Sequence, residues 1–279
     1  MPSPWTQASC ARSVTIMMNQ RELGAVGKGA AAMVLTLVGG FVDAVGYVAL
    51  FQIFTANMSG NSVHIGMYLG KLEPSLARPA CAVGAYVLGL IAARIVLEIG
   101  ARADFHRIAS CMLAAEAMLL LVFARAQPKM HLGQFTDLRS PEYFLLVATL
   151  ALSMGIQAGT LTRIGALTVY TTFVTGTLTK ASESFARFLF WVWDELRLTK
   201  SGVLAVFTRA AKQSDARDAL FLAAVWCSYV IGAALGTAAK FRWELRALYV
   251  PIALLGVFII IDLYRPFGVQ EERYQQRKA

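Results

Sequence analysis

The sequence Gly39-Gly40-Phe41-Val42-Asp43-Ala44-Val45-Gly46-Tyr47 lies inside an apolar run from about residue 30 to residue 51. About 20 helical residues, at roughly 1.5 Å each, cover a hydrocarbon core of about 30 Å. The run is therefore long enough to cross a membrane. Asp43 lies well inside it, and a carboxylate is costly to leave against lipid. We therefore expect its side chain to face protein, water or an opposite charge.

A polar cluster, Asn57-Met58-Ser59-Gly60-Asn61, follows without an ordinary loop. It opens a segment of residues 57–69 that, as a helix, covers roughly 20 Å and is too short to cross alone. Such interrupted backbone is tolerated at membrane depth where it is buried in protein or lines a cavity. The two stretches together favour a functional site over a simple membrane anchor.

The composition indicates a multi-pass helical membrane protein. The 279 residues are 57% hydrophobic and only 15% charged, whereas soluble domains are about 25% charged. The net charge is +9, but Lys and Arg lie mostly between apolar runs, as membrane flanks do. We therefore expect a lipid bilayer as the main partner and no nucleic acid. The Cys and His residues show no metal-ligand spacing, so neither a metal nor another cofactor is expected.

The apolar runs predict eight membrane segments and two tails, residues 1–29 and 266–279. The segments are residues 30–51, 57–69, 79–97, 108–124, 143–161, 166–180, 220–239 and 245–264. The second and sixth are short. Between the sixth and seventh, in residues 181–219, an apolar stripe recurs at helical spacing and predicts a helix lying at the membrane surface. Its residues are Phe185, Phe188, Leu189, Val192 and Trp193. This helix is either a connector or a regulatory element.

The first and second halves of the sequence also resemble each other. Gly39 and Gly155 are separated by 116 residues, as are the starts of Phe54-Thr55-Ala56-Asn57-Met58-Ser59-Gly60-Asn61 and Tyr170-Thr171-Thr172-Phe173-Val174-Thr175-Gly176-Thr177. Ala85-Tyr86-Val87-Leu88-Gly89 matches Ser228-Tyr229-Val230-Ile231-Gly232 with a wider spacing, which the 181–219 insertion explains. We therefore predict an all-α polytopic bundle with an internal tandem repeat, residues 30–140 and 141–265, and two broken or half-length helices.

The sequence leaves the direction of the repeats open. Eight crossings would make them parallel, whereas six crossings, with both short segments dipping in and returning, would make them inverted. Either version places both termini on the side richer in Lys and Arg, which predicts a cytoplasmic location for both. The repeat could serve transport, because short polar segments at matching positions of two halves point to a transporter's binding site. It could also be a duplication kept for packing.

The candidate substrate-binding residues come from the acid and from the two short segments. They are Asp43, Asn57, Ser59, Gly60, Asn61, Gln157, Thr171, Thr175, Gly176 and Thr177. An intramembrane acid marks an ion or proton site by default, and a half-helix N-terminus attracts anions. The alternatives are structural: Asp43 could cap a helix or pair with Arg94 or Arg163, and the Asn and Ser residues could be plain helix caps. Glu116 is a weaker candidate, because it could pair with a neighbouring helix.

The Gly-Gly-Phe-Val-Asp-Ala stretch beginning at Gly39, followed by Asn57-Met58-Ser59-Gly60-Asn61, resembles the YoaK family of bacterial inner-membrane proteins. The resemblance extends from about residue 30 to residue 265, although the 181–219 insertion is atypical for so compact a family. It implies a multi-pass protein of the bacterial inner, or plasma, membrane and names no substrate. The extended piece and half-helix are similar in architecture to the uracil-permease and sulfate-permease fold, which is an analogy of fold alone.

Three functions follow as hypotheses. The first is a secondary transporter or permease of a polar or anionic small molecule, with its site between the two short segments near Asp43. The second is a non-transporting scaffold or a subunit of a complex, and glycine-rich helix faces are also compatible with a homodimer. The third is a membrane-embedded lipid enzyme, which lacks clustered nucleophiles or paired acids. We expect no enzyme activity.

Overall fold

The computed structural model describes residues 25–103, 107–126, 138–160, 163–164, 167–168, 172, 174–198, 206, 209–210 and 213–264. Its helices are α2 (Ala25–Ala49), α3 (Met58–Lys71), α4 (Ala77–Arg102), α5 (Ile108–Arg125), α6 (Pro141–Thr160), α7 (Val174–Leu198), α9 (Ser214–Trp243) and α10 (Tyr249–Tyr264). The 3₁₀ turns η1 (Pro74–Leu76) and η3 (Glu244–Leu248) precede α4 and α10. The strands β1 (Arg163–Ile164) and β2 (Leu167–Thr168) pair antiparallel. The predicted helical class is confirmed.

Five described stretches are long and apolar enough to cross a membrane. They are Gly27–Ala49, Pro74–Gly100, Ile108–Arg125, Pro141–Thr160 and Ser214–Tyr264. The last stretch has 51 residues and contains two helices, α9 and α10. The short helix α3 and the amphipathic helix α7 are outside this set. The prediction of a multi-pass membrane bundle is thus confirmed at the level of its long helices.

The sixth predicted segment was wrong in its bounds. Part of the predicted helix at residues 166–180 is strand β2, and the helix itself begins at Val174 and continues to Leu198. The run Leu167-Thr168-Val169-Tyr170 is rich in β-branched and aromatic residues, which favour extended backbone. No Gly or Pro interrupts the chain from Leu178 to Leu198. The second half-helix and the predicted surface helix are therefore one helix.

Two pairs of parallel helices form the centre of the bundle, α2 with α9 and α4 with α6. A Cβ atom built on Gly232 of α9 would lie 2.1 Å from the carbonyl oxygen of Leu37, and one on Gly236 would lie 2.4 Å from that of Phe41. In the other pair, Gly89 and Gly155 approach the carbonyl oxygens of Leu152 and Tyr86 as closely. Small residues allow such backbone contact, which is how membrane helices commonly pack.

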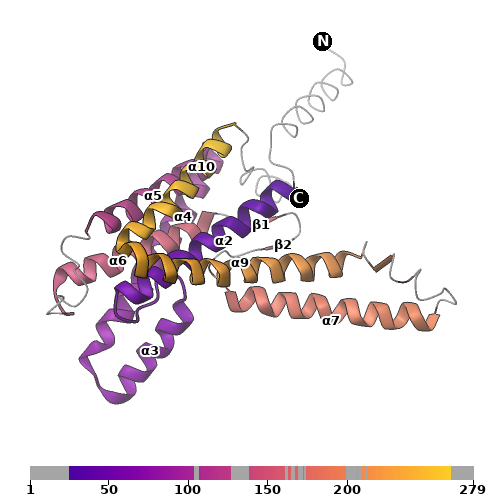
Figure 1. Cartoon of the computed structure of the whole chain (residues 1–279), viewed down its shortest axis with the longest axis horizontal. Coiled ribbons are helices and arrows are strands. Elements are labelled where there is room, and N and C mark those ends of the chain that lie inside the picture. Colours follow the sequence, from indigo (N-terminus) through magenta and orange to yellow (C-terminus); the bar gives the residue numbers. More distant parts are fainter. Residues whose placement is uncertain are drawn as a thin grey trace, which may run out of the picture.

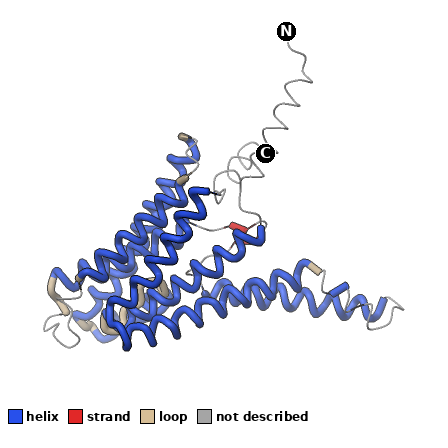
Figure 2. The backbone as a smooth tube through the Cα atoms, turned by 45° about the horizontal axis from the view of Figure 1, so that its top comes forward, coloured by secondary structure: helices blue, strands red, loops and turns tan. Residues whose placement is uncertain are grey.

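The two pairs are joined across α2 and α6, which run antiparallel. The Tyr143 hydroxyl at the start of α6 donates to the carbonyl of Leu50 beyond the end of α2, at 2.8 Å. Near the end of α6, Gln157 Nε2 donates to the carbonyl of Leu35 in the first half of α2, at 2.6 Å. Helices α5 and α10 pack against each other, and α5 also packs on α6. The start of α2 and the end of α10 lie toward the same end of the bundle (Figures 1 and 2).

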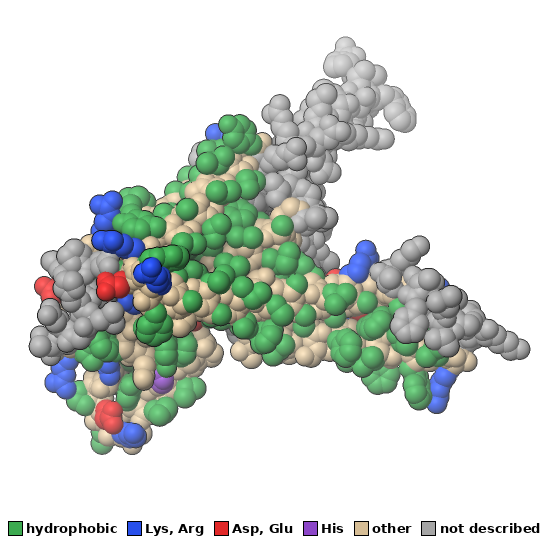
Figure 3. All heavy atoms as spheres, viewed as in Figure 1, with side chains coloured by type: hydrophobic (Ala, Val, Ile, Leu, Met, Phe, Trp, Pro, Cys, Tyr) green, Lys and Arg blue, Asp and Glu red, His purple; other side chains and the backbone are tan. Residues whose placement is uncertain are grey.

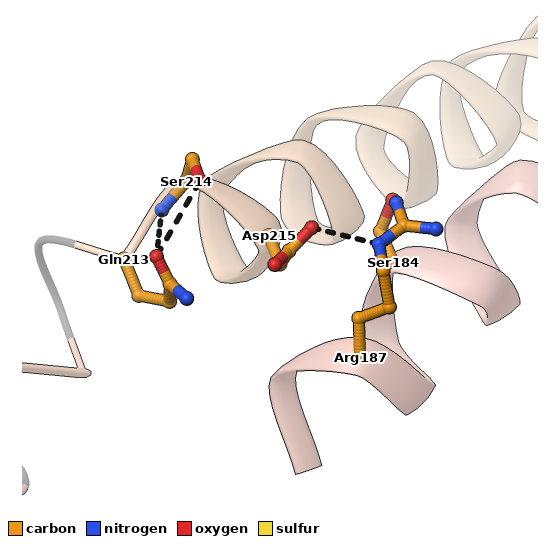
Figure 4. A network of polar contacts seen from close by, with 5 residues as sticks. All are labelled: Ser184, Arg187, Gln213, Ser214 and Asp215. Carbon is orange, nitrogen blue, oxygen red and sulfur yellow. Dashed lines mark hydrogen bonds and ion pairs between the residues drawn. The ribbon is translucent and has the colours of Figure 1, made fainter. Parts of the chain in front are cut away.

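Helix α7 and the first turns of α9 form an arm that projects from the bundle (Figure 1). An ion pair holds the arm together: Arg187 of α7 donates to Asp215 of α9 at 3.0 Å and to Ser184 at 3.0 Å (Figure 4). The aromatic stripe of α7 faces away from α9, since Phe185 and Trp193 are more than half exposed. Figure 3 shows hydrophobic side chains over both arm and bundle. A location at the membrane surface stays a prediction for this helix.

The backbone contact at Gly232 should not tolerate a methyl group. We expect Gly232→Ala to lower the stability of the purified protein by about 1–3 kcal/mol, because the new Cβ would overlap the Leu37 carbonyl. Thermal unfolding in detergent measures this. The matched control is Gly256→Ala in α10, where nothing lies within 4 Å of a built Cβ, so helix propensity should leave stability unchanged or raise it. Equal melting of both variants would contradict the parallel packing of α2 and α9.

Candidate functional site

The carboxylate of Asp43 organises the junction between α2 and α3. After α2 the chain turns through Phe51 and Gln52, both with positive φ, and folds back along the helix. Asp43 Oδ1 then accepts from the backbone N–H groups of Thr55 at 2.6 Å and Ala56 at 2.7 Å, and from the Thr55 hydroxyl at 3.2 Å. Asp43 Oδ2 accepts from the hydroxyl of Tyr229 of α9 at 2.7 Å. The side chain is almost fully buried.

The polar residues that open α3 cap that helix and hold the segment before it. Asn57 is the N-cap, and its side-chain oxygen accepts from the backbone N–H of Gly60 at 3.3 Å and from the Ser59 hydroxyl at 2.7 Å. Asn61 is completely buried and bridges both backbone groups of Phe54, at 3.1 and 2.7 Å. Of these predicted site residues, Ser59 is exposed. Together with Asp43 they form one contiguous cluster around the start of α3.

The predicted residues of the second short segment lie elsewhere. Thr175, Gly176 and Thr177 are in the first turn of α7, with Thr175 exposed and Thr177 buried. Thr171 is outside the described residues. Helix α3 packs on α4 and α7 on α9, and extensive packing between α3 and α7 is absent from the described residues. Gln157 sits on α6, where its Nε2 donates to α2 and its Oε1 has no hydrogen-bond partner in the described ranges.

A second polar cluster contains residues that the site prediction missed. The Tyr86 hydroxyl of α4 and the Thr172 hydroxyl lie 2.8 Å apart, and both side chains line a pocket of about 420 Å³. Arg94 of α4 and Ala158 of α6 also line it. Tyr86 is within electrostatic range of Asp43, so the two clusters are neighbours. A signal was present in the sequence, because Tyr86 and Tyr229 occupy matching positions of the predicted repeat.

Two further buried acids differ sharply in their surroundings. Asp262 of α10, which the site prediction omitted, accepts from the backbone N–H and the hydroxyl of Ser110 in the first turn of α5. It thereby acts as a helix cap from a neighbouring helix. Glu116 of α5 is fully buried, and neither carboxyl oxygen has a hydrogen-bond partner among the described residues. Within the part of the chain that the structure describes, no neighbouring helix offers Glu116 the pairing partner that was one of its predicted roles.

Replacing Asp43 should lower the stability of the protein, whereas replacing Glu116 should not. Asp43→Ala leaves the Thr55 and Ala56 N–H groups buried without acceptors, so we expect it to cost about 3 kcal/mol or more. Glu116→Met keeps similar volume and removes an unpartnered buried carboxyl, so stability should be unchanged or rise by about 1–3 kcal/mol. Thermal unfolding of both purified variants decides this. A loss in Glu116→Met as large as that in Asp43→Ala would show that Glu116 has an essential partner.

Comparisons with known proteins agree on the family. A family model described as "Protein of unknown function (DUF1275)" matches residues 31–261. The chain is also similar to the UPF0700 transmembrane protein YoaK of Bacillus subtilis (strain 168), with 27% identity over 236 residues, 82% of this chain and 92% of the relative. No solved structure matches the chain. The matched residues include both motifs and most of every long helix, and the chain therefore belongs to the DUF1275 (UPF0700) family of YoaK-like transmembrane proteins of unknown function.

Proposed function

We propose that this protein is a small secondary transporter or permease for a polar or anionic small molecule, without a catalytic step of its own. One observation carries the proposal. The carboxylate of Asp43 joins the start of a short helix in the first half of the chain to Tyr229, which lies in the second half. In secondary transporters, substrate sites form where interrupted helices of two related halves meet. Asp43 is then the substrate-contacting or coupling acid.

The halves we propose are two copies of one unit: a long helix, a short polar element and two further helices. The short elements begin at matching places, since α3 starts at Met58 and α7 at Val174, 116 residues later. Helix α3 has only 14 residues, which at roughly 1.5 Å each cannot cross a bilayer. The added length of α7, together with the start of α9, accounts for the insertion.

The helix directions support an inverted relation between these copies. The leading helices α2 and α6 are antiparallel, and each packs in parallel on the third helix of the other copy, α9 and α4. If α3 and α7 do not cross, six helices do, and the start of α2 and the end of α10 lie on one side. The distribution of Lys and Arg supports a cytoplasmic location for that side, in a bacterial inner membrane.

The polar contacts between the copies are reciprocal. Gly40 lies against the carbonyl of Tyr229, and Gly155 lies against the carbonyl of Tyr86. Each of these tyrosines then reaches the short element of the other copy, Tyr229 through Asp43 and Tyr86 through Thr172. These contacts make Gly40 the structural equivalent of Gly155, whereas the sequence comparison matched Gly155 with the neighbouring Gly39. A substrate path between the copies would pass these two neighbouring clusters, without requiring α3 to touch α7.

A second candidate is a membrane scaffold or complex subunit that transports nothing. The observation that favours it is the complete set of contacts around Asp43, which uses both carboxylate oxygens on protein donors. A carboxylate so held can serve the fold alone. The uncovered aromatic stripe of α7 would then be a surface for a partner or for the membrane interface.

Transport by purified protein in liposomes separates the two candidates. We expect uptake of one or more radiolabelled anions from a panel of benzoate, acetate, succinate and phosphate, above the level of empty liposomes. Asp43→Asn keeps an oxygen for the Thr55 and Ala56 N–H groups but loses the charge, so uptake should fall about tenfold with a small change in melting temperature.

The control for the acid is Asp194→Asn, because Asp194 is exposed on α7 and should leave uptake unchanged. If no solute in the panel moves, or if Asp43→Asn transports as well as the unaltered protein, the transporter proposal falls and the scaffold stands.

A further inference from the structure

We propose that the pocket beside Tyr86 binds a carboxylate attached to an apolar group, and that this ligand occupies the place which Asp43 fills in the other half of the molecule. The inference rests on the proposed two-copy architecture and deepens the proposed function by naming the ligand class. It is independent of whether the ligand is carried across the membrane.

The pocket has the size and lining of a small-molecule site. Its volume of about 420 Å³ falls in the usual range for ligand pockets, which are mostly apolar with a few polar groups. Leu90, Ile91 and Ile95 supply apolar walls, and Tyr86, Thr172 and Arg94 supply polar groups. Ile91 and Ile95 are each about half exposed, so the pocket opens on the outer face of α4. On a membrane-spanning helix that face meets lipid, and an apolar group on the ligand suits such an entrance.

The other half of the molecule indicates the chemistry of the missing group. Asp43 lies three residues after Gly40, and Ala158 lies three residues after Gly155. Since the two glycines make equivalent contacts, Asp43 and Ala158 hold equivalent positions. In the first half of the molecule the carboxylate of Asp43 reaches Tyr229 and the start of α3. At the equivalent position of the second half Ala158 has only a methyl group, and the pocket lies beside it. A ligand carboxylate would restore the interaction that the alanine lacks.

The polar groups of the pocket suit an anion. In the Tyr86–Thr172 pair, one hydroxyl donates to the other, so the second proton is available for a ligand oxygen. Arg94 adds positive charge. Arg94 also has another contact in the protein, but a guanidinium has five N–H donors and can serve two partners. The N–H and hydroxyl groups that donate to Asp43 stabilise its nearby charge and weaken its repulsion of a ligand anion.

Binding to the purified full chain tests this inference without any transport assay. Benzoate is the probe, titrated calorimetrically in detergent. Benzylammonium and benzyl alcohol are the cationic and neutral probes of similar shape, and phosphate is an anion without an apolar group. We expect benzoate alone to bind. Tyr86→Phe should weaken binding about tenfold through the lost hydroxyl, whereas Tyr249→Phe, on the exposed surface of α10, should have no effect.

The decisive variant is Ala158→Asp, which places a tethered carboxylate where the ligand is expected. It should abolish benzoate binding and raise the melting temperature above that of the ligand-free protein. If this variant does not fold, Ala158→Leu fills the pocket with an apolar side chain and should also abolish binding.

A second arm identifies the source of the carboxylate. If benzoate does not bind but oleate in nanodiscs raises the melting temperature in a manner that Tyr86→Phe and Ala158→Leu abolish, the ligand is a fatty acid taken from the bilayer. The inference is overturned if neither carboxylate binds, if benzylammonium or phosphate binds as well as benzoate, or if binding survives in the Ala158 variants. Binding without uptake in liposomes would instead contradict transport and leave the carboxylate site standing.

Discussion

The structure depends on one buried carboxylate meeting the backbone of an interrupted segment. After α2 the chain reverses through two residues of positive φ and runs back into the protein, where the N–H groups of Thr55 and Ala56 have no helix or sheet to join. Inside a membrane an unpaired N–H group costs several kcal/mol. Asp43 accepts from both. The same hydrogen bonds stabilise the buried charge of the carboxylate. The carboxylate and the N–H groups therefore each offset the free-energy cost of burying the other.

Close backbone packing determines where that carboxylate points. Helices in lipid gain little from burying apolar side chains, because lipid tails are equally apolar, and they associate through close contact. Gly40, Gly232 and Gly236 let α2 and α9 touch along their backbones, and this contact carries the Tyr229 hydroxyl to Asp43. The packing and the polar site are therefore one arrangement. A shift between the two helices would separate Tyr229 from the acid.

The α7–α9 arm shows how a correct local pattern can be assigned to the wrong element. The apolar stripe from Phe185 to Trp193 does lie on a helix, and Phe185, Leu189 and Trp193 of the stripe are exposed. The prediction divided that helix at Lys180 because the preceding Thr-rich residues resembled a short membrane segment. Helix α7 is instead continuous from Val174, and the Arg187–Asp215 ion pair fastens it to α9. The two predicted elements are therefore parts of one helix, and its ion pair with α9 is a contact that no local pattern records.

What the sequence determined by itself was local: the long apolar helices, the start of α3 at a capping Asn, and the requirement that Asp43 have a partner. These follow from residue periodicity, helix-cap chemistry and the cost of a charge in lipid. Which group is the hydrogen-bond partner of Asp43 depends on the tertiary structure. The partner in another helix is the hydroxyl of Tyr229, 186 residues away along the chain. Helix directions and the pocket beside Ala158 were likewise beyond the sequence, because both arise from contacts between helices that are distant along the chain.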